Sequence, residues 1–347
     1  MRRLLTAVLS CCLAAAAPAA EMPAPAPADT LRLHNIASAF SSFYDANKDK
    51  PEAEQVAAFK REVASSFPAF YGVERYGSGR TQADQDAHIA ATIRAFPSIR
   101  DDYLRKARQF DAELPRYIAG FKAWFPDYRP TVDIYVLHSL GEMDGGTRTF
   151  EGRNYLIFGI DGMVRYHGKG RETAFFDHEL FHTYHDQAMG GCNGNNEPVW
   201  ALLWQEGLAT YVSRAMNPDA TEPELLLDFP DKMAADTRAV LPAAFADLQK
   251  VLESRDDALS GELFSTGKKG EAYRLPVRRG YYLGYLVAQE AARTRSVQAL
   301  ARLDCRQAQA LVRTTVAALV QAHPRYAASN VLQAVSYTTR KVLPVRL

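Results

Sequence analysis

The sequence predicts an α+β fold that is mostly helical, with a small antiparallel sheet before a helix that carries an H-E-x-x-H motif. Two β-rich runs, residues 131–137 and 155–160, flank a polar, glycine-containing turn at 141–147. Amphipathic helical patterns lie on both sides of them, for example at 101–110 and 296–303. The expected order is helices over 30–125, the sheet and the motif helices over 126–220, and further helices over 221–347.

The N-terminus has the pattern of an export signal. Arg2 and Arg3 precede an apolar stretch over 4–16, and the small residues at 17–19 supply a cleavage site. Lipoprotein processing at Cys11 is the less favoured alternative, because the apolar run before it is short. We therefore expect a periplasmic or secreted protein without a transmembrane segment in the mature chain. Its predicted parts are a signal peptide over 1–19, an Ala/Pro-rich spacer over 20–29 and a single domain over 30–347.

Charge and cysteine content narrow the classes of partner. The chain has 41 basic and 40 acidic residues, a formal charge of +1. Loss of Arg2 and Arg3 with the predicted signal leaves 39 basic against 40 acidic residues, or −1, which argues against nucleic acid as a partner. Cys192 and Cys305 remain, and an oxidising compartment would let them pair. The sequence itself indicates no particular oligomeric state.

The H-E-x-x-H motif occupies residues 178–182. Four residues make about one helical turn, so His178 and His182 project from one helix face and can reach the same ion. Glu179 lies about 100° around the helix, where it can hold and deprotonate a metal-bound water. The surrounding phenylalanine and leucine residues predict a buried helix. Unpaired histidine and glutamate side chains would each cost a few kcal/mol there.

A catalytic metal of this type needs a third protein ligand. The candidates are His185, Glu197 and Glu206. His185 lies seven residues beyond His178, roughly 10 Å along the helix axis, and is interpreted as a supporting residue. Glu206 is preferred because it lies in a second apolar helix, where an unpaired glutamate is costly to bury. The alternatives are an arginine ion pair for Glu206 and a solvated loop position for Glu197.

Gly207 follows directly in this second helix. Glycine weakens a helix interior by about 1 kcal/mol relative to alanine. A close backbone approach to the motif helix would explain its presence.

These residues resemble the gluzincin branch of the H-E-x-x-H zinc metallopeptidases, and more narrowly bacterial predicted zinc-dependent proteases of unknown function. The matching features are the motif itself and an E-G-x-A sequence that begins 24 residues after His182, over a resemblance covering residues 130–290. The resemblance implies a zincin-like catalytic domain and one Zn²⁺ held by His178, His182 and Glu206. It implies Glu179 as the general base.

The resemblance has one clear departure. Many gluzincins have an aspartate four residues after the ligand glutamate, and it orients a ligand histidine. This chain has Thr210 there. The supporting role would fall to Asp177, Asp186 or His185, since such partners tune metal affinity and ligand basicity.

A cluster of tyrosine, glycine and arginine residues at 278–286 is a further similarity, because a G-Y-x-x-G-Y stretch follows the glutamate helix in the similar proteases. A tyrosine hydroxyl there would stabilise the developing oxyanion. An arginine would do the same or bind a substrate carboxylate. The candidates are Tyr282, Tyr285 and Arg279, with Tyr281 as the alternative tyrosine. Core aromatics with glycines for close helix packing are the structural alternative.

In gluzincins a comparable sheet also offers an edge strand on which a peptide substrate lies extended. The alternative is a hairpin with no substrate role.

The sequence thus predicts a zinc-dependent peptidase that acts on a peptide or protein substrate. A second hypothesis is an exported zinc-binding protein without turnover, which serves as a peptide- or partner-binding module. A third is a helical structural protein in which the motif is accidental.

Overall fold

The computed structural model describes residues 31–322 apart from 168–169, 190–195, 231 and 269–270. The chain from Leu31 onward forms one compact unit. The predicted signal peptide, the spacer, Cys192 and residues 323–347 lie outside the described residues. Among the residues that are described, no helix has the length and apolar character needed to cross a membrane.

Helices make up most of the described chain, as predicted. Short 3₁₀ helices occupy Ala64–Ser66, Val73–Gly79 and Phe96–Ser98. The α-helices are α1 (Ala37–Asn47), α2 (Glu52–Glu62), α3 (Pro68–Tyr71), α4 (Gln82–Ala95), α5 (Arg100–Trp124), α6 (Ile160–His167), α7 (Thr173–Met189), α8 (Val199–Met216), α9 (Met233–Ala239), α10 (Leu241–Val251), α11 (Asp257–Phe264), α12 (Arg279–Ala291), α13 (Val297–Ala301) and α14 (Cys305–Ala322).

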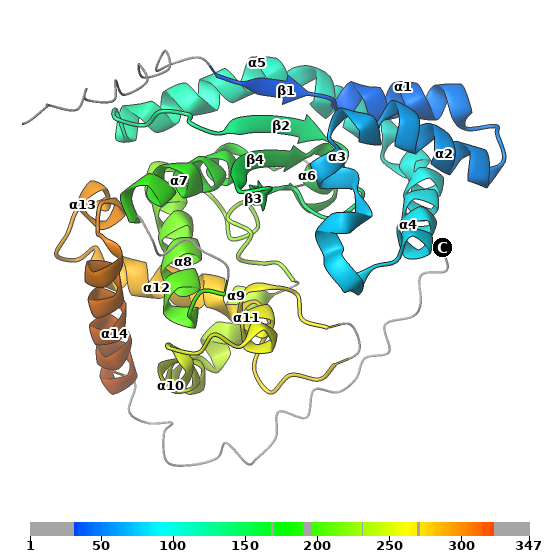
Figure 1. Cartoon of the computed structure of the whole chain (residues 1–347). Coiled ribbons are helices and arrows are strands. Elements are labelled where there is room, and N and C mark those ends of the chain that lie inside the picture. The colour runs from blue at the N-terminus through cyan, green and yellow to red at the C-terminus, as the bar shows by residue number, and fades with distance from the viewer. Residues whose placement is uncertain (1–30, 168–169, 190–195, 231, 269–270, 323–347) are drawn as a thin grey trace, which may run out of the picture. The chain divides into compact units, whose positions relative to one another are not determined.

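The sheet is mixed, so the prediction of an antiparallel sheet was wrong. Its strands are β1 (Leu33–Asn35), β2 (Asp133–Leu137), β3 (Gly145–Phe150) and β4 (Arg153–Gly159), in the spatial order β1-β2-β4-β3. β1 and β4 both pair parallel with β2, and only β3 runs antiparallel to its neighbour β4. The α+β class with a small sheet is confirmed, and Figure 1 shows the strands stacked in this order.

Three expectations about the sheet failed for related reasons. β2 and residues 156–159 of β4 are buried on both faces, which is typical of central strands that need a neighbour at each side. Those neighbours come from β1, in a region expected to be helical, and from β3, in the expected turn. The chain after β4 turns at once into α6, which begins at Ile160.

Aromatic packing holds the sheet against the helices. Phe158 of β4 packs against Phe110 of α5 at 5.2 Å and Phe176 of α7 at 5.1 Å between ring centroids. On the opposite face, Phe67 stacks on Tyr135 of β2 at 3.9 Å. Because α7 is fixed to the sheet by Phe176, the face of α7 that carries the motif is held beside the edge strand β3.

A glycine pair sets the crossing of α8 and α12. A Cβ atom added to Gly207 would lie 2.3 Å from the Cα atom of Gly284, and one added to Gly284 would lie 2.4 Å from the carbonyl oxygen of Leu203. Neither position has room for a side chain. The predicted close approach at Gly207 therefore exists, but its partner is α12 and not the motif helix.

Candidate metal centre

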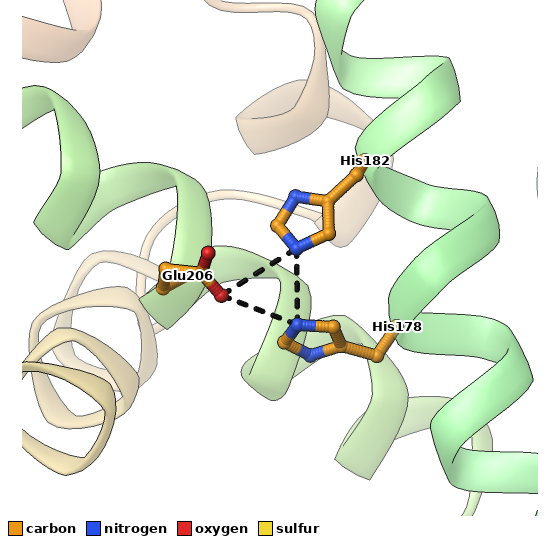
Figure 2. A group of neighbouring side chains, drawn as sticks. All are labelled: His178, His182 and Glu206. Carbon is orange, nitrogen blue, oxygen red and sulfur yellow. Dashed lines mark hydrogen bonds and ion pairs between the residues drawn. The ribbon is translucent and has the colours of Figure 1, made fainter. Parts of the chain in front are cut away.

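Two histidines of α7 and a glutamate of α8 meet at one point. The Nε2 atoms of His178 and His182 lie 3.0 Å apart. Oε2 of Glu206 lies 3.3 Å from Nε2 of His178 and 3.5 Å from Nε2 of His182. Figure 2 shows the three side chains converging from the two helices. Among the described residues, this is the group of histidine, cysteine and carboxylate side chains that could hold a metal ion.

The spacing of these atoms suits a small tetrahedral ion. Ligand bonds of about 2.0–2.1 Å give a tetrahedron whose edges are about 3.3–3.4 Å long. The three observed separations, 3.0, 3.3 and 3.5 Å, bracket that value. Oε2 of Glu206 is also buried without a hydrogen-bond partner in the described structure, although two imidazoles lie close to it. The donor atoms thus face a common centre more than they face one another.

The negative charge of Glu206 favours positive charge within this group, either a proton on His182 or a metal ion in its place. Burial alone would raise the pKa of Glu206, but His182 and His178 hold it well below its usual range. Burial opposes the charge on His182, yet the Glu206 carboxylate outweighs that effect and raises the pKa of His182 to about 9. Burial lowers the pKa of His178 and keeps its imidazole neutral, as a metal ligand must be.

Glu179 lies beside the triad in a nearly closed environment. It is 7% exposed, and its Oε2 atom has no hydrogen-bond partner in the described structure. Burial, helped by the charges of Asp144 and Glu206, raises its pKa to about 8. A Cβ atom at Gly145 of β3 would lie 3.1 Å from Cγ of Glu179, so the glycine brings the edge strand directly against this carboxylate.

A cleft of about 540 Å³ opens over these residues. One wall is the edge strand β3 with residues 145–149, and the floor carries the triad and Glu179. Asp186, Glu197 and Gln205 line the remainder with Tyr281. The cleft is therefore bounded on one side by β3, the edge strand of the sheet among the described residues, and on the other by α7 and α8.

Tyr281 is the tyrosine of α12 that reaches the triad. Its ring stacks on that of His178 with 6.4 Å between centroids, and it lines the cleft. Burial, followed by the charge of Glu206, raises the pKa of its phenol well above the usual value. Tyr281 lies one helical turn before Gly284, and Glu206 directly precedes Gly207. The glycine crossing of α8 and α12 thus brings the phenol to the carboxylate.

The sequence analysis preferred Tyr282, Tyr285 and Arg279 of this cluster as catalytic candidates. All three lie away from the cleft, so the structure does not bring them to the site where they were expected. Tyr282 accepts a hydrogen bond from Arg238 at 3.0 Å on the far side of α12. Tyr285 packs against Tyr282 and Tyr211. None of these side chains lines the cleft. The helix phase explains this. Gly284 must face α8, and of the three tyrosines in this cluster only Tyr281, three positions before Gly284, shares that face.

Arg279 is bound into the core instead of the cleft. It is 1% exposed and pairs with Glu262 and, at 3.1 Å, with Asp247. Its role here is to join α12 to the end of α10 and to α11.

Three of the expected supporting residues, Asp177, His185 and Thr210, form no hydrogen bond with the triad's histidines among the described residues. Asp177 accepts a hydrogen bond from Asn217 at 2.7 Å, and burial raises its pKa to about 7. His185 stacks on Phe181, and its buried Nε2 atom has no partner in the described structure. Thr210 donates to the carbonyl oxygen of Glu206 at 2.8 Å, which fixes the ligand's own turn of α8.

Cys305, at the start of α14, is disulfide-bonded. Cys192, its predicted partner, lies outside the described residues.

Sequence reasoning overlooked Asp144, and within the 278–286 cluster it preferred Arg279 to Arg278 and undervalued Tyr281. Asp144 binds His167 at 2.9 Å and accepts a hydrogen bond from the backbone N–H of Gly145 where β3 begins. The signal that could have identified Tyr281 is the pair of helix-interior glycines, which sets the face of α12.

No family model, curated protein or solved structure matched this chain. The functional assignment therefore depends on the site itself.

Proposed function

We propose that this protein is a zinc-dependent peptidase whose metal is held by His178, His182 and Glu206. The observation that carries the proposal is the convergence of these three donors beside the buried carboxylate of Glu179. Export to the periplasm or the cell exterior is part of the proposal, and the disulfide at Cys305 supports it because disulfides persist in oxidising compartments.

The donor set favours zinc. Two imidazole nitrogens and one carboxylate oxygen are a catalytic zinc combination, which leaves a fourth position for water or substrate. Zinc bound there would polarise the scissile carbonyl and lower the pKa of a bound water. Oε2 of Glu206 is buried without a hydrogen bond and lies close to both imidazoles, which fits the requirement for a cation at this point.

Glu179 is the proposed general base. Burial raises the pKa of Glu179, which makes its ionised carboxylate a stronger base. In that form it can accept a proton from water and deliver it to the leaving amine. Its unpartnered Oε2 is available for that exchange. The raised pKa arises from burial against β3 and from neighbouring negative charge.

Tyr281 and β3 are proposed to orient the substrate. The buried Tyr281 phenol keeps its proton, so it can donate a hydrogen bond to the carbonyl oxygen as negative charge develops there. The free edge of β3 offers backbone N–H and C=O groups to an extended peptide. Such pairing would hold the scissile bond in the cleft, next to the metal group and Glu179.

The test is a peptide-library cleavage screen with the wild type and Glu179→Gln. The proposal expects cleavage by the wild type that chelator abolishes, and loss of about 10²–10⁴-fold in Glu179→Gln with zinc content unchanged. Glu142→Gln is the matched control, since Glu142 pairs with Arg75 outside the metal group. Undiminished turnover in Glu179→Gln rejects the mechanism. Peptide binding without any cleavage would favour the alternative of a zinc-bearing binding module.

A further inference from the structure

A second, smaller pocket adjoins the main cleft beside His178 and Glu179. Its volume is about 90 Å³, roughly the space of three water molecules. It shares Gly145, His178, Glu179 and Tyr281 with the cleft, so the two spaces meet at the proposed reaction centre. Ala174, Phe175, Leu225 and Leu226 form the apolar part of its walls, and polar and charged side chains form the rest.

Arg278 is the cation of this pocket. The residue is 8% exposed, and its guanidinium lies 3.8 Å above the ring centroid of Tyr281. Nη1 donates to the carbonyl oxygens of Leu226 at 2.6 Å and of Phe229 at 3.0 Å. These two bonds and the stacking fix its plane while leaving its other N–H groups unused by the described residues.

Arg278 lacks the counter-charge that a buried arginine usually has. No carboxylate of the described residues lies within ion-pairing distance of it, whereas its neighbour Arg279 pairs with two. Three carboxylates line the pocket. One is Glu179, the proposed general base, and the other two are bound by other residues. Glu224 is held by Arg171, and Asp144 by His167. A buried guanidinium without an anionic partner costs several kcal/mol, and an anion from outside would offset that cost.

The backbone at Arg278 supports a fixed role. Its backbone φ is +60°, a left-handed conformation that residues other than glycine rarely adopt. This conformation begins α12 and turns the side chain back over Tyr281. Strain at a residue that lines a site is typical of positions held for function.

We infer that Arg278 binds a carboxylate group of the substrate in this pocket, next to the scissile bond. The inference rests on the proposed peptide cleft. A planar carboxylate matches the guanidinium fork, and the volume admits a carboxylate on one or two methylene groups. Two peptide groups have this chemistry: an aspartate or glutamate side chain, and the free C-terminal carboxylate. The protein is therefore selective for acidic or C-terminal peptide segments.

Matched peptide pairs test the inference. One pair exchanges Asp for Asn in an amidated peptide, and the other exchanges a free C-terminus for an amide. Binding is measured by fluorescence anisotropy on metal-loaded Glu179→Gln protein, which separates recognition from turnover. Hydrogen bonds to a buried charge predict that the carboxylate member of one pair binds about tenfold to a hundredfold tighter. The pair that shows the preference identifies the source of the carboxylate.

The same pairs are measured in Arg278→Lys and Arg279→Lys within the Glu179→Gln background. Lysine retains the charge and the stem but lacks the guanidinium fork, so the preference should fall at least about fivefold in Arg278→Lys. It should persist in Arg279→Lys, whose side chain lies outside the pocket. Thermal melting and zinc content show that each variant is folded.

Equal binding within both pairs, no binding of any carboxylate peptide, or an unchanged preference in folded Arg278→Lys overturns the inference. If the wild type hydrolyses peptides without any such preference, the carboxylate site at Arg278 is rejected and the proposed peptidase activity is retained. If the preference for carboxylate peptides depends on Arg278 but the wild type cleaves no peptide, the proposed peptidase activity is rejected and the carboxylate site is retained.

Discussion

Tyr281 allows the most selective test of the proposed catalytic chemistry. Its phenol lines the cleft beside the triad, whereas the adjacent Tyr282 faces Arg238. We predict that Tyr281→Phe lowers kcat about 10²–10³-fold and retains zinc, because one donor to the oxyanion is lost. Tyr282→Phe is the matched control and should change kcat by less than about threefold. Equal losses in the two variants would show that Tyr281 has no special role.

Because Tyr128 is buried, we expect the free energy of unfolding to change with pH in the alkaline range. Burial raises its pKa to about 12, although a hydrogen bond with Thr183 opposes the shift. The folded phenol keeps its proton to higher pH than the unfolded one does, with a pKa of about 10. Its contribution is therefore complete below pH 10 and is lost as pH rises through 12, by at most about 3 kcal/mol.

Denaturant unfolding of the wild type and Tyr128→Phe between pH 8 and pH 12 measures this contribution. The stability difference between the two proteins should shrink above pH 10, because only the wild type has the phenol to ionise at this position. Parallel pH profiles would contradict the placement of Tyr128 in the core.

At the scale of elements, the contact of α8 with α12 determines whether Glu206 and Tyr281 meet. A Cβ atom at Gly284 would lie 2.4 Å from the carbonyl oxygen of Leu203, so Gly284→Ala must push the helices apart. We predict a loss of about 1–3 kcal/mol in unfolding free energy and a weakened zinc affinity.

Gly120→Ala on α5 is the control for that variant. A Cβ atom there meets nothing within 4 Å, so the substitution should stabilise the protein by about 0.5–1 kcal/mol through helix propensity. If Gly284→Ala is as stable as Gly120→Ala, the close helix crossing is wrong.

Local patterns account for the elements that the sequence predicted correctly. Helical spacing placed His178 and His182 on one face, and the cost of burying an unpaired carboxylate identified Glu206. Both inferences need only neighbouring residues and a burial argument. The face of α12 could not be predicted in this way, because it depends on Gly284 meeting Gly207 in another helix. Tyr282 and Tyr285 were therefore preferred to Tyr281.

The sheet failed for the same kind of reason. β1 has three residues and no alternating pattern long enough to identify it, and it exists because β2 offers it an edge. β3 carries two glycines that read as a turn, and it is held by pairing with β4 and by packing on Glu179. Strand pairing over long separations in sequence decides both cases.

For the whole molecule, the metal is expected to link α7 to α8 and thereby stabilise the unit. A ligand bound only by the folded state at a thousand times its Kd adds about 4 kcal/mol. We predict that chelation lowers the Tm of the wild type by several degrees and that added zinc restores it. His178→Ala should melt near the chelated wild type and show no response to chelator. A wild type whose Tm ignores chelator would contradict this link between the helices.

The most direct test of the central claim is the zinc stoichiometry of purified protein by mass spectrometry of its metals. The account predicts one zinc per chain in the wild type and in Glu179→Gln. It predicts loss of zinc in Glu206→Ala, whose carboxylate lies 3.3 Å from Nε2 of His178. A wild type that neither retains nor takes up zinc, or a Glu206→Ala variant that holds it as tightly as the wild type, would contradict the account.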